Sequence, residues 1–505
     1  MNQGTDKPQS VYAAIDLGSN SFHMLVATPE GNSIRKIDSL RMPTRLAAGL
    51  DKNKRLLPET EALALDALAK FSERLRDVPR ENIRVVGTNT LRRAKKRERF
   101  MREAQRLLGK PIEIISGREE ARLIYSAVSH TYPETEQRRL VLDIGGGSTE
   151  LALGSGVHPA LMESVNMGCV SYTNLYLNSG QTITAATMKQ AMIQAQLELQ
   201  PLTVAYKQYG WDEVVGCSGT IKVAARMLAE LAITDGTITR DGLRQLARLI
   251  ISEGSAAALK LTCISPSRSQ VIAGGIVVLR AIMRTLDITH IHASQVALRE
   301  GLIFEMLGKA EHLDIQSQTI ANLTARYSID MRQADRVENT AVKLFNHVTD
   351  TWNLDADTDL QLLVWAAKLH ELGMGVAHTQ YHKHGAYILE NSDLLGFTQA
   401  EQKALALLVR YHRRKIEHEA FNTLTDDESH RLSLLLSLLR LSALLHRGRY
   451  DDPLDNVNVV IKAGQITVVA PQIWLDEHPL TYAELIGEAE RLTHVNIKLK
   501  AENSA

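Results

Sequence analysis

The chain has 505 residues, which at roughly 150 residues per domain predicts about three or four domains. Lys and Arg together number 58, as do Asp and Glu, so the formal net charge is zero and we expect no nucleic-acid partner. With 44% hydrophobic and 23% charged residues, the composition excludes a disordered or fibrous protein.

No part of the sequence indicates membrane insertion or export. No window holds the roughly 18 consecutive apolar residues of a transmembrane helix, and the first ten residues lack the apolar core of a signal peptide. Cys169, Cys217 and Cys263 are scattered and odd in number, which favours buried reduced thiols over a disulfide framework or a zinc site. We therefore expect a large cytoplasmic enzyme, with peripheral membrane association left open.

Strands and helices alternate near the start of the chain. Residues 11–17 and 22–27 predict two buried strands, with a tight turn at 28–32. Periodicity and composition then predict, in order, a helix at 58–75, a strand at 82–87, a basic helix at 91–108, a strand at 111–115 and a helix from Ser116. This alternation predicts an α/β layer.

The sequence contains an internal repeat. The segment 12–27 aligns without gaps on the segment around 140–155, so that Asp16 falls on Asp143 (143 − 16 = 127), Gly18 on Gly145 and Ser21 on Ser148. Each copy is a strand, an aspartate, a Gly-rich turn and a second strand. The repeat predicts a duplicated pair of domains with a cleft between them.

From about residue 312 the pattern changes to amphipathic helices, for example at 334–348, 360–372 and 402–412. After Asp452-Pro453, two short strands around a turn at 462–464 predict a hairpin, followed by a helix at 482–492 and a strand at 495–499. We predict an all-helical domain and then a small α+β domain.

The two Gly-rich turns are candidate phosphate-binding loops. Phosphate oxygens need several converging N–H donors, and glycine allows the backbone to approach closely. One loop comprises Gly18, Ser19, Asn20 and Ser21, and the other comprises Gly145, Gly146, Gly147, Ser148 and Thr149. A pair of ordinary hairpin turns is the alternative.

Asp143 and Glu150 flank the second loop. Two carboxylates beside a phosphate site repel the substrate unless a cation lies between them, and Mg²⁺ prefers few carboxylates together with water and phosphate oxygens. We expect these two residues to bind Mg²⁺. The alternatives are an Asx turn at Asp143 and a solvated strand position at Glu150.

Glu119 and Glu120 have different expected roles. Ser116 and Glu119 match a capping box, so Glu119 has a structural role. Glu120 projects about 100° away around the helix. It could order a water molecule in the cleft, although it could also be an ordinary surface glutamate.

We expect most of the basic stretch from Arg92 to Arg106 to form a solvated helix face. Arg92 differs because it follows Thr88-Asn89-Thr90 directly after a predicted strand end, where a guanidinium suits phosphate oxygens. Positive charge beyond the site would suit a long polyanion.

His370-Glu371 stands where a metal phosphohydrolase of the HD type carries His-Asp, with His382, His384 and His412 downstream. The preceding helix offers no histidine near Gln333, so the ligand set is incomplete. We expect a structural or substrate-channel role for these histidines.

The sequence resembles the exopolyphosphatase / guanosine pentaphosphate phosphohydrolase family over essentially its whole length. The motifs responsible are AIDLGSNSFHMLV (14–26), GTNTLRRA (87–94), ISGREEARLIYSAV (115–128), LDIGGGSTEL (142–151), GCSGTIK (216–222) and LREGLI (298–303).

This resemblance implies two actin/sugar-kinase-like (ribonuclease H-like) domains at 1–125 and 126–311 that flank a cleft. It also implies a degenerate HD-like helical domain at 312–450 and a small α+β domain at 451–505. Mg²⁺ dependence, a homodimer and release of terminal phosphate are implied as well.

Carried over by motif, the catalytic glutamate of the family is Glu120, its metal-side acids are Asp143 and Glu150, and the arginine of its TNTLR element is Arg92. Its phosphate loops match residues 18–21 and 145–149. His370-Glu371 departs from the family's His-Asp, so no second hydrolytic centre is implied.

The stretches 382–397 and 408–415 are more similar to the exopolyphosphatase branch. We expect Mg²⁺-dependent release of orthophosphate from inorganic polyphosphate by water attack; the alternative is hydrolysis of guanosine pentaphosphate (pppGpp) to ppGpp, or both activities. Two rivals remain open. One is a kinase or ATPase with an adenine pocket near Gly274-Gly275, and the other is a non-catalytic sensor of polyanions or alarmones.

Overall fold

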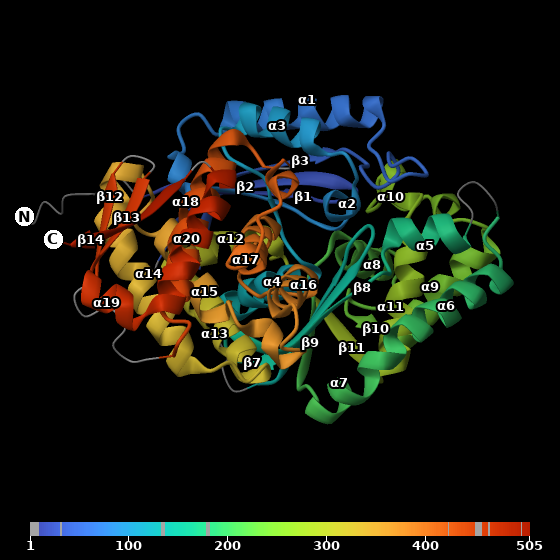
Figure 1. The fold of residues 1–505 in the computed structure, drawn as a ribbon. Coiled ribbons are helices and arrows are strands. Elements are labelled where there is room, and N and C mark those ends of the chain that lie inside the picture. Colours follow the sequence, from blue (N-terminus) through green and yellow to red (C-terminus); the bar gives the residue numbers. More distant parts are fainter. Residues whose placement is uncertain are drawn as a thin grey trace, which may run out of the picture. The chain divides into compact units, whose positions relative to one another are not determined.

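The computed structural model describes residues 10–30, 33–132, 137–177, 182–422, 424–449, 457–462, 465–495 and 497–504. The chain divides into two compact units, Met1–His312 and Leu313–Ala505 (Figure 1). The further domain boundaries at 125 and 450 stay predictions.

The first unit begins with a mixed five-stranded sheet. In spatial order its strands are β3 (Ser33–Pro43), β2 (Ser21–Glu30), β1 (Tyr12–Leu17), β4 (Ile83–Gly87) and β5 (Glu113–Ile114). β1 pairs antiparallel with β2 and parallel with β4. Figure 1 shows α1 (Pro58–Arg74) and α3 (Glu98–Leu108) lying together along this sheet, where they bury Phe71 and Phe100 against its apolar face.

A second sheet repeats the same arrangement. Its strands, in spatial order, are β10 (Ile238–Thr239), β11 (His290–Ala293), β9 (Glu213–Gly216), β6 (Arg139–Ile144), β7 (Thr149–Ser155) and β8 (His158–Val165). Asp143 lies opposite Glu150 in the β6–β7 pair, as Asp16 lies opposite His23 in the β1–β2 pair. The predicted duplication is therefore confirmed at the level of strand register.

Helices cover the outer face of the second sheet: α5 (Cys169–Tyr176), α6 (Ala185–Leu199), α7 (Thr203–Tyr209), α8 (Gly219–Glu230), α9 (Arg240–Ser252) and α11 (Ile272–Leu286), with the short α10 (Pro266–Ser269) before α11. Two other helices, α4 (Gly117–Thr131) and α12 (Leu298–Leu307), share one apolar core with both sheets. That core includes Val86 of β4, Val141 of β6 and Leu302 of α12.

Two local predictions for this unit are wrong. The basic stretch 91–108 forms two helices, α2 (Asn89–Arg93) and α3, because Ala94 takes an extended conformation and Lys96 a positive φ of 54°. The Arg97 guanidinium donates to the Arg92 carbonyl at 3.2 Å and so helps to end α2. The turn expected at 28–32 begins later, because β2 continues to Glu30; Gly31 and Asn32 lie outside the described residues.

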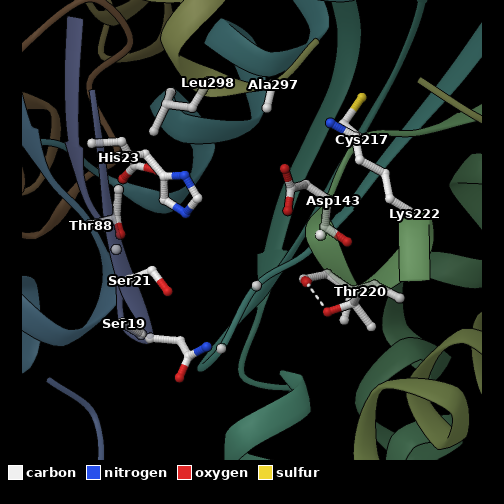
Figure 2. Close-up of a pocket in the computed structure, with 18 of the residues that line it drawn as sticks. Ser19, Ser21, His23, Thr88, Asp143, Cys217, Thr220, Lys222, Ala297 and Leu298 are labelled. Carbon is white, nitrogen blue, oxygen red and sulfur yellow. Dashed lines mark hydrogen bonds between the residues drawn. The ribbon is translucent and has the colours of Figure 1, made fainter. Parts of the chain in front are cut away.

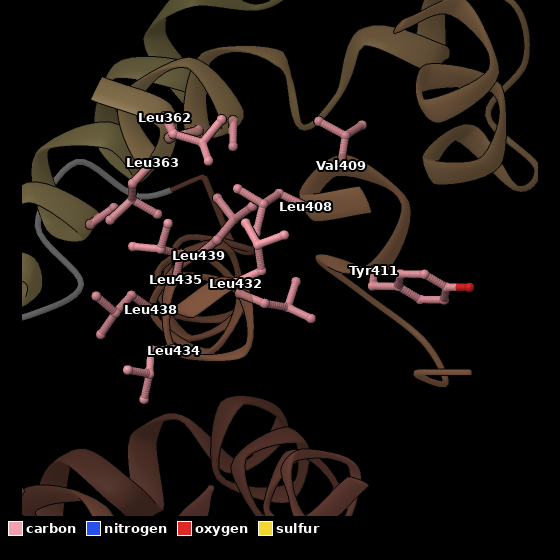
Figure 3. Close-up of a cluster of buried hydrophobic side chains, with 14 of the residues drawn as sticks. Leu362, Leu363, Leu408, Val409, Tyr411, Leu432, Leu434, Leu435, Leu438 and Leu439 are labelled. Atoms are coloured by element: carbon pink, nitrogen blue, oxygen red, sulfur yellow. The ribbon is translucent and has the colours of Figure 1, made fainter. Parts of the chain in front are cut away.

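The second unit is built around helices, as predicted. They are α13 (Lys309–Arg326), α14 (Met331–Trp352), α15 (Thr358–Leu369), α16 (Tyr381–Asn391), α17 (Gln399–Tyr411) and α18 (Asp426–Leu445). Figure 3 shows leucines of α18 packed against Leu362 and Leu363 of α15 and Leu408 of α17.

A small α+β segment completes this unit. Strands β12 (Asn458–Lys462) and β13 (Gln465–Pro471) form the predicted hairpin, whose turn residues Ala463 and Gly464 lie outside the described part of the chain. β14 (Lys498–Ser504) pairs parallel with β13, and the helices are α19 (Gln472–Glu477) and α20 (Pro479–Leu492). Ile466 and Leu485 pack in the same core as the helices.

Candidate active site

The two sheets of the first unit enclose a cavity of about 440 Å³. Figure 2 shows Ser19, Ser21, His23 and Thr88 on one wall, and Asp143, Cys217, Thr220 and Lys222 on the other. The walls come from the two copies of the internal repeat and from the segments that follow them.

The two Gly-rich loops meet at this cavity. A Cβ atom added to Gly146 would lie 3.1 Å from Cβ of Ser19, and one added to Gly147 would lie 2.6 Å from Oδ1 of Asn89. The two loops are therefore in close contact at Gly146 and Ser19, and a side chain at Gly147 cannot fit against Asn89 of α2 without movement. This contact places one loop of each sheet at the same end of the cleft, as the repeat predicts.

Most of the predicted phosphate-binding residues line the cavity: Gly18, Ser19, Asn20, Ser21, Gly145, Gly146 and Ser148. Gly147 and Thr149 do not line it. Thr149 is fully buried and its hydroxyl donates to the Met167 carbonyl. Thr149 therefore stabilises the second Gly-rich loop through this hydrogen bond and does not face the cavity.

Glu120 lies on the first turn of α4 and lines the cavity. The Ser116 hydroxyl accepts a hydrogen bond from the Glu119 backbone N–H at 3.1 Å, which is the Ser116 half of the expected capping box, while the Glu119 carboxylate binds Arg122. Oε2 of Glu120 is buried, has no hydrogen-bond partner among the described residues, and lies 3.7 Å from Nη1 of Arg92. Glu119 thus lies at the helix cap and Glu120 faces the cavity, as predicted.

Arg92 does not line the cavity itself. Its Nη1 donates to the Ile115 carbonyl at 2.6 Å, which ties the end of α2 to the residue just before the α4 cap. Arg92 therefore affects the site indirectly, through its contact with Glu120 and its hydrogen bond to the segment that begins α4.

Four carboxylates gather around the cavity and perturb one another. Burial and the neighbouring Glu150 raise the pKa of Glu120 well above its ordinary value. Burial, with Glu150 and Asp16, raises the pKa of Asp143 to about 8, and burial raises the pKa of Asp16 to about 6 against the effect of Arg299. Such mutual repulsion favours binding of a cation among them.

The donor set fits Mg²⁺ shared with a substrate. Within the described residues, no group of three or more His, Cys, Asp or Glu side chains is arranged to hold a metal alone, but Mg²⁺ commonly takes one or two carboxylates, water and phosphate oxygens. Oδ1 of Asp16 is buried without a hydrogen-bond partner in the described structure, and Asp143 lines the opposite wall. These two carboxylates, which line the cavity from β1 and β6, would hold the ion.

Glu150 is placed differently from Asp143. It is buried, accepts a hydrogen bond from the Ser164 hydroxyl at 2.8 Å and does not line the cavity. Its charge acts on the site from behind the wall, and the metal-binding role predicted for Asp143 and Glu150 stays a prediction.

Several cavity residues were not among the predicted site residues. Cationic side chains from four elements line it: Arg41, Lys222, Arg226, Arg268 and Arg299. Arg41 donates to the Ser21 hydroxyl at 3.2 Å. Burial lowers the pKa of His23 well below its ordinary value, and Arg299, Arg41 and Arg268 lower it further. Lys222 and Arg299 fall in the motifs 216–222 and 298–303, whereas Arg41 and Arg268 lie in no motif.

The structure also bears on two other sites considered from the sequence, the adenine pocket near Gly274-Gly275 and the His370-Glu371 pair. Gly274 and Gly275 are buried in α11, where an added Cβ would lie 2.5 Å from the Cys169 carbonyl oxygen or 2.3 Å from Cγ2 of Thr220, so an adenine ring cannot lie against either glycine. In the second unit, Arg449 binds both carboxylate oxygens of Glu371, at 2.8 and 2.9 Å. Nδ1 of His370 lies 2.6 Å from the Ala367 carbonyl oxygen.

Among the helices that the structure describes, none combines the length and apolar content needed to cross a membrane.

Comparison with known proteins gives one consistent answer. The model of the Ppx/GppA phosphatase family matches residues 25–310, and that of domain III of these phosphatases matches residues 315–489. A guanosine-5'-triphosphate,3'-diphosphate pyrophosphatase of Pseudoalteromonas translucida (strain TAC 125) is 35% identical over 497 residues, covering 98% of this chain and 99% of that protein. The protein of the same name from Aeromonas hydrophila is 38% identical over 484 residues, covering 95% and 96%.

Solved structures agree in fold. The Ppx/GppA family member of Aquifex aeolicus has a TM-score of 0.52 at 23% identity, covering 60% of this chain and 99% of that one. An exopolyphosphatase from Cytophaga hutchinsonii has a TM-score of 0.54 at 21% identity, covering 59% and 98%. The predicted fold class, an actin-like α/β pair followed by a helical region, is confirmed. The chain belongs to the Ppx/GppA phosphatase family.

Proposed function

We propose that the protein hydrolyses the terminal 5'-phosphate of guanosine pentaphosphate, giving ppGpp and orthophosphate. The observation that carries this proposal is the 35–38% identity, through both units, to proteins named guanosine-5'-triphosphate,3'-diphosphate pyrophosphatase. This identity supports the alternative expected from the sequence over the exopolyphosphatase reading.

The proposed reaction is an in-line attack of water on the terminal phosphorus. The new bond joins the water oxygen to phosphorus, the bond to the bridging oxygen breaks, and the water proton passes to Glu120. Such transfers depend mainly on positioning and on neutralising charge. The Glu120 carboxylate oxygen without a hydrogen-bond partner in the described structure suits the task of orienting the water.

The loops and the cationic wall would hold the phosphates. Backbone N–H groups around Gly18 and Gly145 can donate to phosphate oxygens, and Arg41, Arg268 and Arg299 supply charge around the same cavity. Asp16 and Asp143 would hold Mg²⁺, which would supply positive charge against the phosphate oxygens. Both ends of pppGpp carry phosphates, so a cavity with cations on several walls suits this substrate.

Inorganic polyphosphate is the second candidate substrate. A basic cavity of about 440 Å³ lies within the second unit and is lined by Lys383, Arg410, Arg413, Arg414 and Lys415, with Glu417 as its acidic residue. Crowded cations of this kind favour a polyanion. These residues belong to the stretches on which the sequence favoured polyphosphate.

The test is orthophosphate release from pppGpp and from long-chain polyphosphate, measured side by side with Mg²⁺. We expect a higher kcat/KM for pppGpp, and no turnover after chelation of the metal. A higher kcat/KM for polyphosphate would reverse the order of the two candidates. Tight binding of pppGpp without phosphate release would favour the sensor instead. A homodimer and a cytoplasmic location stay predictions.

A further inference from the structure

A continuous row of charged side chains connects α4 and α12 to the first sheet. Arg84 of β4 donates to Glu113 of β5 at 2.8 Å, and Glu305 of α12 accepts hydrogen bonds from both Arg84 and Arg122. Arg122 then binds both carboxylate oxygens of Glu119, at 2.9 and 2.7 Å. The row ends one residue before Glu120.

This row is buried. The side chains of Glu119, Arg122 and Glu305 are 2%, 7% and 6% exposed. Buried ion pairs contribute little net stability compared with apolar side chains of the same volume, because removing charges from water is costly. Their directional hydrogen bonds instead fix the geometry of the elements that carry them.

The row acts on the helix turn that carries the proposed water-orienting group. Glu119 and Glu120 point about 100° apart around α4: Glu119 faces the row and Glu120 faces the cavity. Nearby, α4 and α12 cross almost backbone to backbone, since a Cβ on Gly301 would lie 2.1 Å from the Leu123 carbonyl oxygen. Rotation of α4 about its axis would therefore break the row.

We infer that Glu305 and Arg122 are positioning residues, which fix the rotation of α4 and so hold the Glu120 carboxylate at the cavity. This inference rests on the proposed role of Glu120. Neither Glu305 nor Arg122 lines the cavity, so they act through Glu120. Small displacements of a catalytic group lower the rate of the chemical step more than they weaken substrate binding.

The test is Glu305→Gln, which keeps the shape and removes the charge. We expect kcat for pppGpp to fall roughly tenfold or more while KM changes less than about twofold. The matched control is Glu488→Gln in the second unit, because Glu488 is similarly buried (5% exposed) and also accepts from two arginines, Arg440 and Arg491. The control should lose similar stability and keep its kcat.

Two further measurements separate positioning from general destabilisation. In a Glu120→Gln background, Glu305→Gln should not lower the residual turnover again, because the group it positions is already disabled. Hydrogen exchange of residues 116–124 should become faster in Glu305→Gln and stay unchanged in Glu488→Gln. The exchange measurement needs no substrate, so it tests the inference even if pppGpp is not turned over, which would count against the proposed function alone.

Three results would overturn the inference: an unchanged kcat in Glu305→Gln, an equal fall in the Glu120→Gln background, or unchanged exchange at the start of α4. If Glu305→Gln does not fold, Glu113→Gln at the more exposed end of the row (27% exposed) takes its place. That variant should lower kcat roughly threefold, and an unchanged kcat with unchanged exchange would contradict the inference equally.

Discussion

Nη1 of Arg92 lies 3.7 Å from Oε2 of Glu120 and donates to the Ile115 carbonyl at 2.6 Å. One guanidinium therefore contacts the proposed water-orienting carboxylate and also anchors the residue before the cap of its helix. The positive charge lowers the pKa of Glu120, which burial and Glu150 raise well above the ordinary value.

Arg92→Gln should shift the acidic limb of the pH profile. Glu120 must be ionised to accept a proton, so activity rises with pH through its pKa. Without Arg92 that pKa is higher still, and we expect the acidic limb of kcat/KM to move to higher pH. The matched control is Arg93→Gln at the next, exposed position, and an unshifted profile in Arg92→Gln would contradict the pairing.

Gly147→Ala should weaken substrate binding. The new Cβ would lie 2.6 Å from Oδ1 and 3.2 Å from Cγ of Asn89, which is itself buried. Overpacking of this kind costs about 1–3 kcal/mol of folding stability unless Asn89 moves, and Asn89 lines the cavity. We therefore expect the Kd for ppGpp, the proposed product, to rise. Titration calorimetry measures this directly.

Gly487→Ala is the control for this substitution. Gly487 lies in α20, and its Cβ would meet only the Arg491 side chain at 3.6 Å or more. Alanine is the better helix former, so this variant should bind ppGpp normally and unfold at a slightly higher temperature. Equal binding by both variants would mean that the close fit of Gly147 against Asn89 does not shape the site.

Asp143→Asn should stabilise the metal-free protein at high pH. The folded-state pKa of about 8 lies above the ordinary 3.8, so the contribution of Asp143 is favourable below pH 3.8 and is lost as the pH rises through 8. We expect the variant to gain about 1–2 kcal/mol at pH 9, less than the full shift implies because water reaches the cavity wall. It should gain nothing at pH 3.5.

Mg²⁺ should reverse the order of stability of Asp143→Asn and the unaltered protein at high pH. An ion that binds only the folded state stabilises it, so Mg²⁺ should raise the Tm of the unaltered protein more than that of Asp143→Asn. Thermal unfolding at pH 9 with and without Mg²⁺ checks both statements. A variant that is less stable than the unaltered protein in chelator would show that the carboxylates do not repel one another in the absence of the ion.

The sequence predicts what depends on local pattern. The repeat placed Asp16 and Asp143 at equivalent strand ends, and the cap at Ser116 separated the roles of Glu119 and Glu120. Each copy of the repeat, like the cap, is a pattern of residues within a few positions of one another. The strand register and the helix cap in the structure agree with them.

Features that depend on tertiary packing were missed or wrong. Arg41 on β3, Arg268 on α10 and Arg299 on α12 converge on one cavity although they are far apart in the chain, and no local pattern marks Arg41 or Arg268. The row from Glu113 to Glu119 likewise joins four elements. The break at Ala94 interrupts a segment whose residues mostly favour helix, and the Arg97 side chain donates a hydrogen bond to the Arg92 carbonyl there.

The most direct test of the whole account is Glu120→Gln. Because only the proton-accepting oxygen is replaced, we expect pppGpp to bind with a Kd within about twofold of the unaltered value. Turnover should fall roughly 10²–10⁴-fold, the usual contribution of a general base. Single-turnover phosphate release with a binding titration on the same sample measures both, and near-native turnover in this variant would contradict the account.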